Sequence, residues 1–426
     1  MKRAWVLAAL GMLLMTAPVL AAENLSGEIT VWSWDVAAEA LQATVPSFNE
    51  KYPNVKVNII DLGNQNVFDR GLAGCAAGGV DLPDVYSIEN NEAEVFWSRF
   101  PECWTDLREF GADQLYNDFP QFKWAELMQD GKIYAIPWDS GPVVMFYRRD
   151  LYEAAGIDPA SIETWDDFIE AGKKMLAATN GRVRMATISL GSDDEFYRML
   201  VNQAGGWYWD ETASYVTVHK EPSVRAFETI KKMYDAGILA VGGWNEQIQY
   251  FKNGVVASSL FGSWYEGTIR QNAPEQAGLW GVYLMPAFEP GGPRAANLGG
   301  SALAIPASSK NKKAAWAFVE HALATAEGQI TMLQQSGLTP SYLPALEHPY
   351  VAQPHPYWGN QAIWVDILGT LEQVPPARGT QFFEEARRIM TATLADYVGG
   401  KYASAQEALN AAARQISMAT GLPVAP

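Results

Sequence analysis

Short apolar strands alternate with longer helical patterns along the N-terminal part of the chain. Residues 28–34 and 55–61 predict strands, and between them residues 37–53 carry apolar positions at helical spacing and end at a proline. Residues 64–77 form a second helical pattern, and residues 83–90 predict a third strand. This β-α-β-α-β order predicts an α/β fold with a mostly parallel sheet and helices on both faces.

The ends of these predicted strands are polar or aromatic. In open parallel sheets, ligands bind in the crevice outside the carboxyl ends of the strands. We therefore expect these positions to contribute to a binding site: Trp34, Asp35, Asn64, Gln65, Glu89 and Asn90.

The same alternation continues towards the C-terminus. Residues 143–157 predict a strand and a short helix, and residues 163–178 predict an amphipathic helix, with Thr164 as N-cap and Asp167 completing a capping box. The last amphipathic patterns cover residues 382–397 and 403–418. A chain of 426 residues is too long for one ordinary core, so we expect two domains. Because no low-complexity linker separates them, the chain is expected to cross between the domains several times.

The N-terminus has the pattern of a secretory signal peptide. Lys2 and Arg3 precede an apolar run over residues 4–15, and small residues follow up to a cleavage site near Ala22. The alternative is an uncleaved anchor helix. No cysteine follows the site, so lipid attachment there is excluded. We expect cleavage of residues 1–22 and export of a monomer into a bacterial periplasm, without membrane insertion.

The charge of the chain excludes some partners. The formal net charge is −17, and removal of the two N-terminal cations leaves 29 basic against 48 acidic residues, or −19. Such a surface repels nucleic acid and anionic membranes.

Cysteines and histidines are few. Cys75 and Cys103 are the only cysteines, and in an oxidising compartment they most simply pair, the alternative being two buried free thiols. The four histidines lack metal-ligand spacing, so we expect no metal site and no cofactor.

Tryptophan is abundant, with 16 residues, many of them beside Gly, Asp, Ser or Asn in turn-like stretches. An indole offers a flat face to sugar C–H groups, while neighbouring amides and carboxylates bind hydroxyls. Taken singly, each Trp is more often a packing residue. The stretches concerned are "WSWD", "GGWYWDE", "GGWNEQ", "GSWYEG" and "YWGN".

Four segments in order resemble one family. "LPDVYSIEN", "IYAIPWDSGPVVMFYRRDLYEAAGIDPASIETWDDFIEAGKKM", "FKNGVVASSLFGSWYEG" and "GGSALAIPASSKNKKAAWAFVEHAL" are similar to landmarks of the extracellular solute-binding proteins of sugar importers, the group that contains the maltodextrin-binding protein. Arg148-Arg149 departs from the usual Asn-Lys, outside the expected cleft. The resemblance covers nearly all of the mature chain.

The resemblance implies a two-lobed periplasmic-binding-protein fold of type II, with a hinge of several crossing strands. The crossings are expected near residues 136–141, 297–301 and 341–346, so that Trp138 and Asp139 face the cleft and Gly141 permits the bend. The expected division is residues 23–137 with 298–343 for lobe 1, and 138–297 with 344–426 for lobe 2.

The function implied by the resemblance is binding of one mono- or oligosaccharide and its delivery to the permease of an ABC-type importer, without chemistry. Trp264 matches a sugar-stacking position of the family, and Arg378 is a candidate because a guanidinium can donate to adjacent hydroxyls. The full set of expected ligand-binding residues is Trp34, Asp35, Gln65, Glu89, Asn90, Asp139, Asp194, Trp264, Gly300 and Arg378.

Two alternatives remain at the level of the sequence. A secreted glycoside hydrolase would also use Trp platforms and needs two acids across one bond, for which Asp139 and Glu266 are candidates. A binding protein of the same fold could instead take a peptide or a polyamine. A serine hydrolase is poorly supported because the chain has no GxSxG motif.

Overall fold

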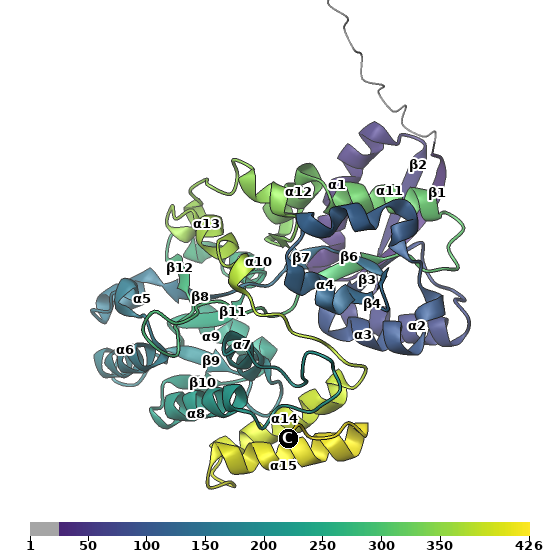
Figure 1. Ribbon diagram of the computed structural model, residues 1–426. Helices are drawn as coiled ribbons and strands as arrows, with labels where there is room; N and C mark the ends of the chain where they lie inside the picture. The colour runs from purple at the N-terminus through teal and green to yellow at the C-terminus, as the bar shows by residue number, and fades with distance from the viewer. Residues whose placement is uncertain (1–24) are drawn as a thin grey trace, which may run out of the picture.

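The computed structural model describes residues 25–426, so the expected signal peptide at residues 1–22 lies outside the described residues. Two lobes lie side by side (Figure 1), and the two-lobed α/β fold expected from the sequence is confirmed. In the described part of the chain, no helix is long and apolar enough to cross a membrane.

Lobe 1 is built on a five-stranded sheet in the order β2-β1-β3-β13-β6. β1 pairs in parallel with β2 and β3, whereas β13 is antiparallel to both of its neighbours. Helices cover the sheet as the hydrophobic pattern predicted: buried Leu41 and Phe48 of the first helix share a core with Ile29 and Val31 of β1. The strands are β1 (Gly27–Ser33), β2 (Val55–Asp61), β3 (Val85–Glu89), β6 (Ala135–Pro137) and β13 (Ser301–Ala304), and the main helices are α1 (Asp35–Lys51), α2 (Asn64–Ala76), α3 (Asn90–Arg99), α4 (Gln121–Leu127), α11 (Lys312–Leu323) and α12 (Ala326–Ser336).

Lobe 2 has its own, larger core around a sheet in the order β11-β8-β12 and a pair β10-β9. The β10-β9 pair is parallel, but β8 is antiparallel to both β11 and β12, which corrects the expectation of mostly parallel strands for this lobe. Strand direction depends on where the chain re-enters the sheet, and the hydrophobic pattern does not record this. The strands are β8 (Val143–Arg148), β9 (Ala186–Ile188), β10 (Leu239–Val241), β11 (Ser258–Gly262) and β12 (Trp280–Leu284).

The helices of lobe 2 surround these sheets. The C-terminal pair α14 and α15 packs against α8 at the bottom of Figure 1. The expected capping box is present at the start of α6, where Thr164 Oγ1 accepts from the amide of Asp167 at 3.2 Å. The helices are α5 (Arg149–Ala154), α6 (Trp165–Ala178), α7 (Glu195–Gln203), α8 (Glu221–Asp235), α9 (Trp244–Lys252), α10 (Tyr265–Asn272), α13 (Ile363–Leu368), α14 (Phe383–Val398) and α15 (Ala405–Thr420).

The lobes are joined where three chain segments meet. β7 (Asp139–Ser140) pairs antiparallel with β14 (Thr339–Pro340), and Pro142 bridges to Asn297. Asn297 Oδ1 also accepts from the amide of Gly141 at 2.9 Å. The first crossing therefore contacts both of the other crossings where the lobes are joined.

Candidate functional site

A cavity of about 490 Å³ lies between the lobes and is lined by residues from both. A second cavity of about 360 Å³ shares part of this lining and continues towards the crossings. We call the two together the cleft. The residues that line both parts are Asn64, Glu89, Trp244, Trp264 and Gly299.

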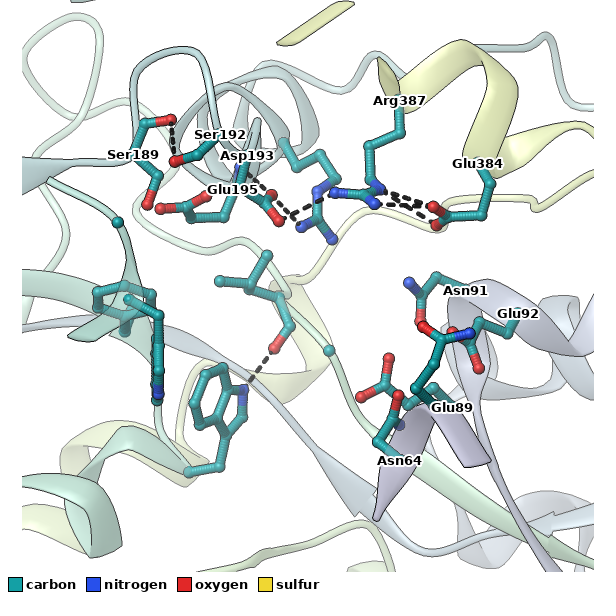
Figure 2. A pocket seen from close by; sticks show the side chains of 18 of the residues that line it. Asn64, Glu89, Asn91, Glu92, Ser189, Ser192, Asp193, Glu195, Glu384 and Arg387 are labelled. Atoms are coloured by element: carbon teal, nitrogen blue, oxygen red, sulfur yellow. Dashed lines mark hydrogen bonds and ion pairs between the residues drawn. The ribbon is translucent and has the colours of Figure 1, made fainter. Parts of the chain in front are cut away.

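The lobe 1 wall of the cleft is made of acids and amides at the carboxyl end of the sheet, as strand order predicts. Glu89 is the last residue of β3, and Glu92 lies in the first turn of α3. Figure 2 shows their carboxylates beside Asn64 and Asn91. Burial raises the pKa of Glu89 to about 7, against the opposing effect of Arg198 across the cleft. Burial and the neighbouring Glu89 also raise the pKa of Glu92.

The lobe 2 wall carries an ion-pair network between the loop before α7 and α14. Arg387 Nη1 lies 3.0 Å from Asp193 Oδ2, and its Nη2 lies 2.7 Å from Glu384 Oε2 (Figure 2). Arg198 pairs with Asp193 at 3.0 Å and with Asp194 at 2.9 Å. Although burial acts in the opposite direction, the two arginines lower the pKa of Asp193. The guanidinium groups are therefore held in place by acids of their own lobe.

Aromatic side chains form the third side of the cleft. Trp264 is half-buried, and its Nε1 donates to the carbonyl of Leu298 at 2.8 Å, which fixes the indole next to the second crossing. Trp244 lies beside it with ring centroids 6.1 Å apart, and 44 % of Trp244 is exposed. Because the indole nitrogen of Trp264 is already bonded, the ring face is what this residue offers to a ligand.

The floor of the cleft depends on a buried lysine. Lys123, from α4, is fully buried, and its ammonium donates to Asn90 Oδ1 at 2.8 Å and to the carbonyl of Asp139 at 2.6 Å. Asp139 Oδ1 accepts from the amide of Ser301 at 2.8 Å. Gly300 has φ +107°, and a Cβ there would lie 2.7 Å from both Lys123 Nζ and the Asp139 carbonyl, so a side chain at this position is excluded.

The structure brings most of the predicted site residues to the cleft. Three others lie elsewhere: Asn90 faces the buried Lys123, Asp194 is enclosed behind the wall with Arg198 and Tyr208, and Arg378 lines a separate cavity of about 530 Å³. The residues that do line the cleft are Trp34, Asp35, Gln65, Glu89, Asp139, Trp264 and Gly300.

Trp138 does not face the cleft as expected. It is 1 % exposed, belongs to the core of lobe 1, and directs its Nε1 to Met332 Sδ at 3.0 Å. Its neighbour Asp139 points the other way because successive side chains of a strand alternate between faces.

Several residues that line the cleft were not predicted from the sequence. Trp244 lies in the stretch "GGWNEQ", which already carried the signal of a Trp beside glycines. Glu384 and Arg387 gave no such signal, because the first turns of α14 look like any charged helix surface. The sequence pointed to the segment around Asp193, but it did not show which of the adjacent acids there faces the cleft.

Cys75 and Cys103 form a disulfide with a Cα–Cα distance of 5.5 Å, the first of the two alternatives left by the sequence. Among residues 25–426 no group of three or more His, Cys, Asp or Glu side chains is placed to hold a metal ion.

Comparison with known proteins places this architecture in a family. The profile of the bacterial extracellular solute-binding proteins matches residues 33–329. The chain is 29% identical over 384 residues to the lactose-binding protein of Rhizobium radiobacter, covering 88% of this chain and 89% of that protein. It is 27% identical to the arabinooligosaccharide-binding protein of Bacillus subtilis, covering 80% and 81%.

Solved structures share the fold. An ABC transporter associated binding protein from B. animalis subsp. lactis, solved with β-1,6-galactobiose, has a TM-score of 0.75 at 26% identity and covers 92% of this chain and 97% of that one. A receptor of Streptomyces glaucescens, solved unliganded and with acarbose, has a TM-score of 0.77 at 23% identity, covering 92% and 98%.

Proposed function

Because this chain belongs to the bacterial extracellular solute-binding proteins, as the resemblance of its motifs predicted, we propose that it binds a mono- or oligosaccharide in the cleft and delivers it to an ABC-type importer. The observation that carries the proposal is the composition of the cleft: Trp244 and Trp264 line it from lobe 2, and carboxylates and amides line it from lobe 1. Aromatic faces with convergent polar groups suit a ligand that has apolar ring faces and hydroxyl edges. Relatives named for lactose and arabinooligosaccharides support a sugar.

Binding is proposed to act by closure. Lobe 1 supplies Glu89, and lobe 2 supplies Trp264 and the network around Arg387, so a ligand that contacts both walls stabilises the closed arrangement more than the open one. This difference in affinity is required, because a ligand that bound both states equally would leave their populations unchanged. The permease subunits of the importer, as partners of a monomer in the periplasm, would then recognise the closed form.

Catalysis is not part of the proposal, and the family is one of binding proteins. The acid pair considered for a glycoside hydrolase finds no support in the geometry. Glu266 is 1 % exposed, and its Oε1 accepts from Trp358 Nε1 at 3.0 Å and from Arg270 Nε at 3.0 Å. Glu266 is absent from the lining of the cleft, whereas Asp139 belongs to it. Two carboxylates that face different surroundings cannot flank one glycosidic bond.

The test is a thermal-shift screen of the mature protein against mono-, di- and trisaccharides, followed by calorimetry. A ligand that binds the folded state must raise the melting temperature. Replacing Trp264 by alanine should weaken binding by about 1–2 kcal/mol, a factor of roughly 5–30, because the stacking face is lost. Trp264→Phe keeps a ring face and should retain more of the affinity.

Trp32→Ala is the matched control, since Trp32 is also half-buried but lines neither part of the cleft. It should leave the affinity for sugar unchanged. Because the Trp264 indole also bonds to Leu298, the variants are compared at a temperature at which each is folded. A panel in which no sugar shifts the melting temperature, or release of reducing ends from an oligosaccharide, would contradict the proposal.

A further inference from the structure

We propose that the preferred solute is a sugar that carries a protonated amine, an amino sugar or an oligosaccharide containing one. This inference rests on the proposed function, since it takes the cleft to be the sugar site and specifies the charge of its ligand. The inference follows from an excess of carboxylates over cations in the lining of the cleft.

Acids outnumber cations in the lining of the cleft. Seven carboxylates and two guanidinium groups line it, and the lining contains no lysine or histidine. An oriented excess of one charge sign in a recess concentrates ligands of the opposite sign. The acids are Asp35, Glu89, Glu92, Asp139, Asp193, Glu195 and Glu384, and the cations are Arg198 and Arg387.

The two cations are already neutralised within lobe 2. Arg387 is held by Glu384 at 2.7 Å and Asp193 at 3.0 Å, and Arg198 is held by Asp193 and by the enclosed Asp194. Each guanidinium is therefore shared between two acids of its own wall. Neither forms an ion pair with a described carboxylate of the opposite wall, although both oppose the effect of burial on the pKa of Glu89.

Two acids of lobe 1, Glu89 and Glu92, have no such partner among the described residues. Within residues 25–426, neither the carboxylate of Glu89 nor that of Glu92 accepts a hydrogen bond or forms an ion pair, and Figure 2 shows both residues on the side of the cavity opposite Arg387. A second, independent observation comes from lobe 2. Glu195 is only 8 % exposed, and its Oε2 has no hydrogen-bond partner in the described part of the chain. Both walls of the cleft thus present carboxylates that form no ion pair within the described chain, although Glu195 Oε1 accepts from Gln247 Nε2 at 3.3 Å.

Closure of the lobes removes these carboxylates from water, which costs free energy. A carboxylate removed from water must be paired, hydrogen-bonded or protonated. Burial raises the pKa of Glu89 and that of Glu195 to about 7, so near pH 7 protons would compensate part of the charge. A sugar hydroxyl donates a hydrogen bond but leaves the net charge in place. An ammonium group donates three hydrogen bonds and also supplies the missing positive charge.

The aromatic side of the cleft favours the same ligand. The faces of Trp244 and Trp264 attract a cation placed over them as well as the C–H face of a sugar ring. A bare metal ion fits less well, because no group of three or more potential ligands is gathered anywhere in the described residues. A linear polyamine would satisfy the acids but would leave the broad indole faces without a ring to stack on.

The experiment is calorimetry at about pH 7 on the mature protein, where an amine that titrates like an α-amino group is mostly protonated. The probes form a matched set: the fully deacetylated chitosan disaccharide, its N-acetylated form, and lactose, with glucosamine, N-acetylglucosamine and glucose as the monosaccharide set. Spermidine is included as a cation without rings. We expect the amine-bearing sugars to bind at least tenfold more tightly than both neutral counterparts, with net proton release on binding because the ammonium lowers the pKa of Glu89.

Variants that replace one carboxylate by an amide show which residues cause the preference for the amine. Glu89→Gln and Glu92→Gln should each weaken the binding of the amine-bearing sugars more than that of the neutral sugars, so that the ratio of the two affinities loses most of its tenfold preference. The control is Glu153→Gln, an exposed acid of α5 outside the cleft, which removes the same charge and should preserve the preference.

Equal or tighter binding of the neutral sugars to the native protein overturns the inference and leaves the proposed function intact. Tight binding of spermidine with no binding of any sugar overturns both. Retention of the amine preference in both Gln variants overturns the assignment to these two carboxylates.

Discussion

Replacing Lys123 by methionine is expected to destabilise the protein strongly, although no ligand is involved. The ammonium is fully buried in the floor of the cleft and holds Asn90 Oδ1 at 2.8 Å, the Asp139 carbonyl at 2.6 Å and, more weakly, the Ser301 carbonyl at 3.4 Å. These acceptors belong to α3 and to two of the chain crossings. Methionine fills a similar volume but donates nothing, so the change isolates the charge and its hydrogen bonds.

The size of the expected destabilisation follows from the two short hydrogen bonds of the ammonium. Hydrogen bonds to a charged group contribute about 1.5–3 kcal/mol each, and buried acceptors left without a donor cost about 1–3 kcal/mol. The methionine avoids the desolvation of the ammonium, which offsets part of this loss. The two short bonds together contribute about 3–6 kcal/mol, and with the offset from desolvation we expect Lys123→Met to cost about 3–5 kcal/mol.

The measurement is urea unfolding of the ligand-free protein by circular dichroism, with Lys174→Met as the control. Lys174 is an exposed residue of α6, so its replacement makes the same chemical change on the surface and should alter the free energy of unfolding by less than about 0.5 kcal/mol. A loss below about 1 kcal/mol for Lys123→Met, or a gain in stability, would show that desolvation outweighs the hydrogen bonds and would refute the reasoning.

Three further predictions concern the scaffold. Thr164→Ala should lower the free energy of unfolding by about 1 kcal/mol in denaturant titration, because the N-cap of α6 is lost, and an unchanged midpoint would contradict the capping role. Replacing Cys75 and Cys103 by serine should cost about 3–4 kcal/mol for a sequence separation of 28, and a thiol assay on the denatured native protein should find no free thiol. Burial raises the pKa of both Glu126 and Glu195 to about 7, so the folded state binds more protons than the unfolded state between about pH 4.5 and 7. Their contribution to stability therefore falls as pH rises through this window, and the ligand-free melting temperature should be higher at about pH 5 than at pH 7.5. Double replacement by glutamine should reduce this dependence, and Glu89, whose pKa burial also raises to about 7, should supply part of what remains.

Local features of the fold were predictable because they depend on residues close in sequence. The second strand was expected at residues 55–61 and is found at Val55–Asp61, and the helix expected at residues 64–77 is found at Asn64–Ala76. The capping box of Thr164 was expected from two residues three positions apart. In each case the period of apolar positions or a cap within one turn carries the information.

The candidate site was only partly predictable. Glu89 follows from its position at a strand end and Trp264 from the resemblance to the family, and both line the cleft. Asp194 and Arg378 carried a similar chemical signal but point into other surroundings. Arg387 was missed because the side that a charged helix residue faces depends on which helix packs beside it.

By itself, the sequence determined the elements, their order and the kinds of side chain at the strand ends, since these depend on local periodicity and residue chemistry. Only the tertiary structure decided that β8 runs antiparallel to its neighbours and that Lys123 meets Asn90 and the Asp139 carbonyl. It also decided which carboxylates of the cleft remain without a cation. Such facts join residues far apart in the chain, and burial, which sets the strength of their interactions, exists only after the lobes have folded.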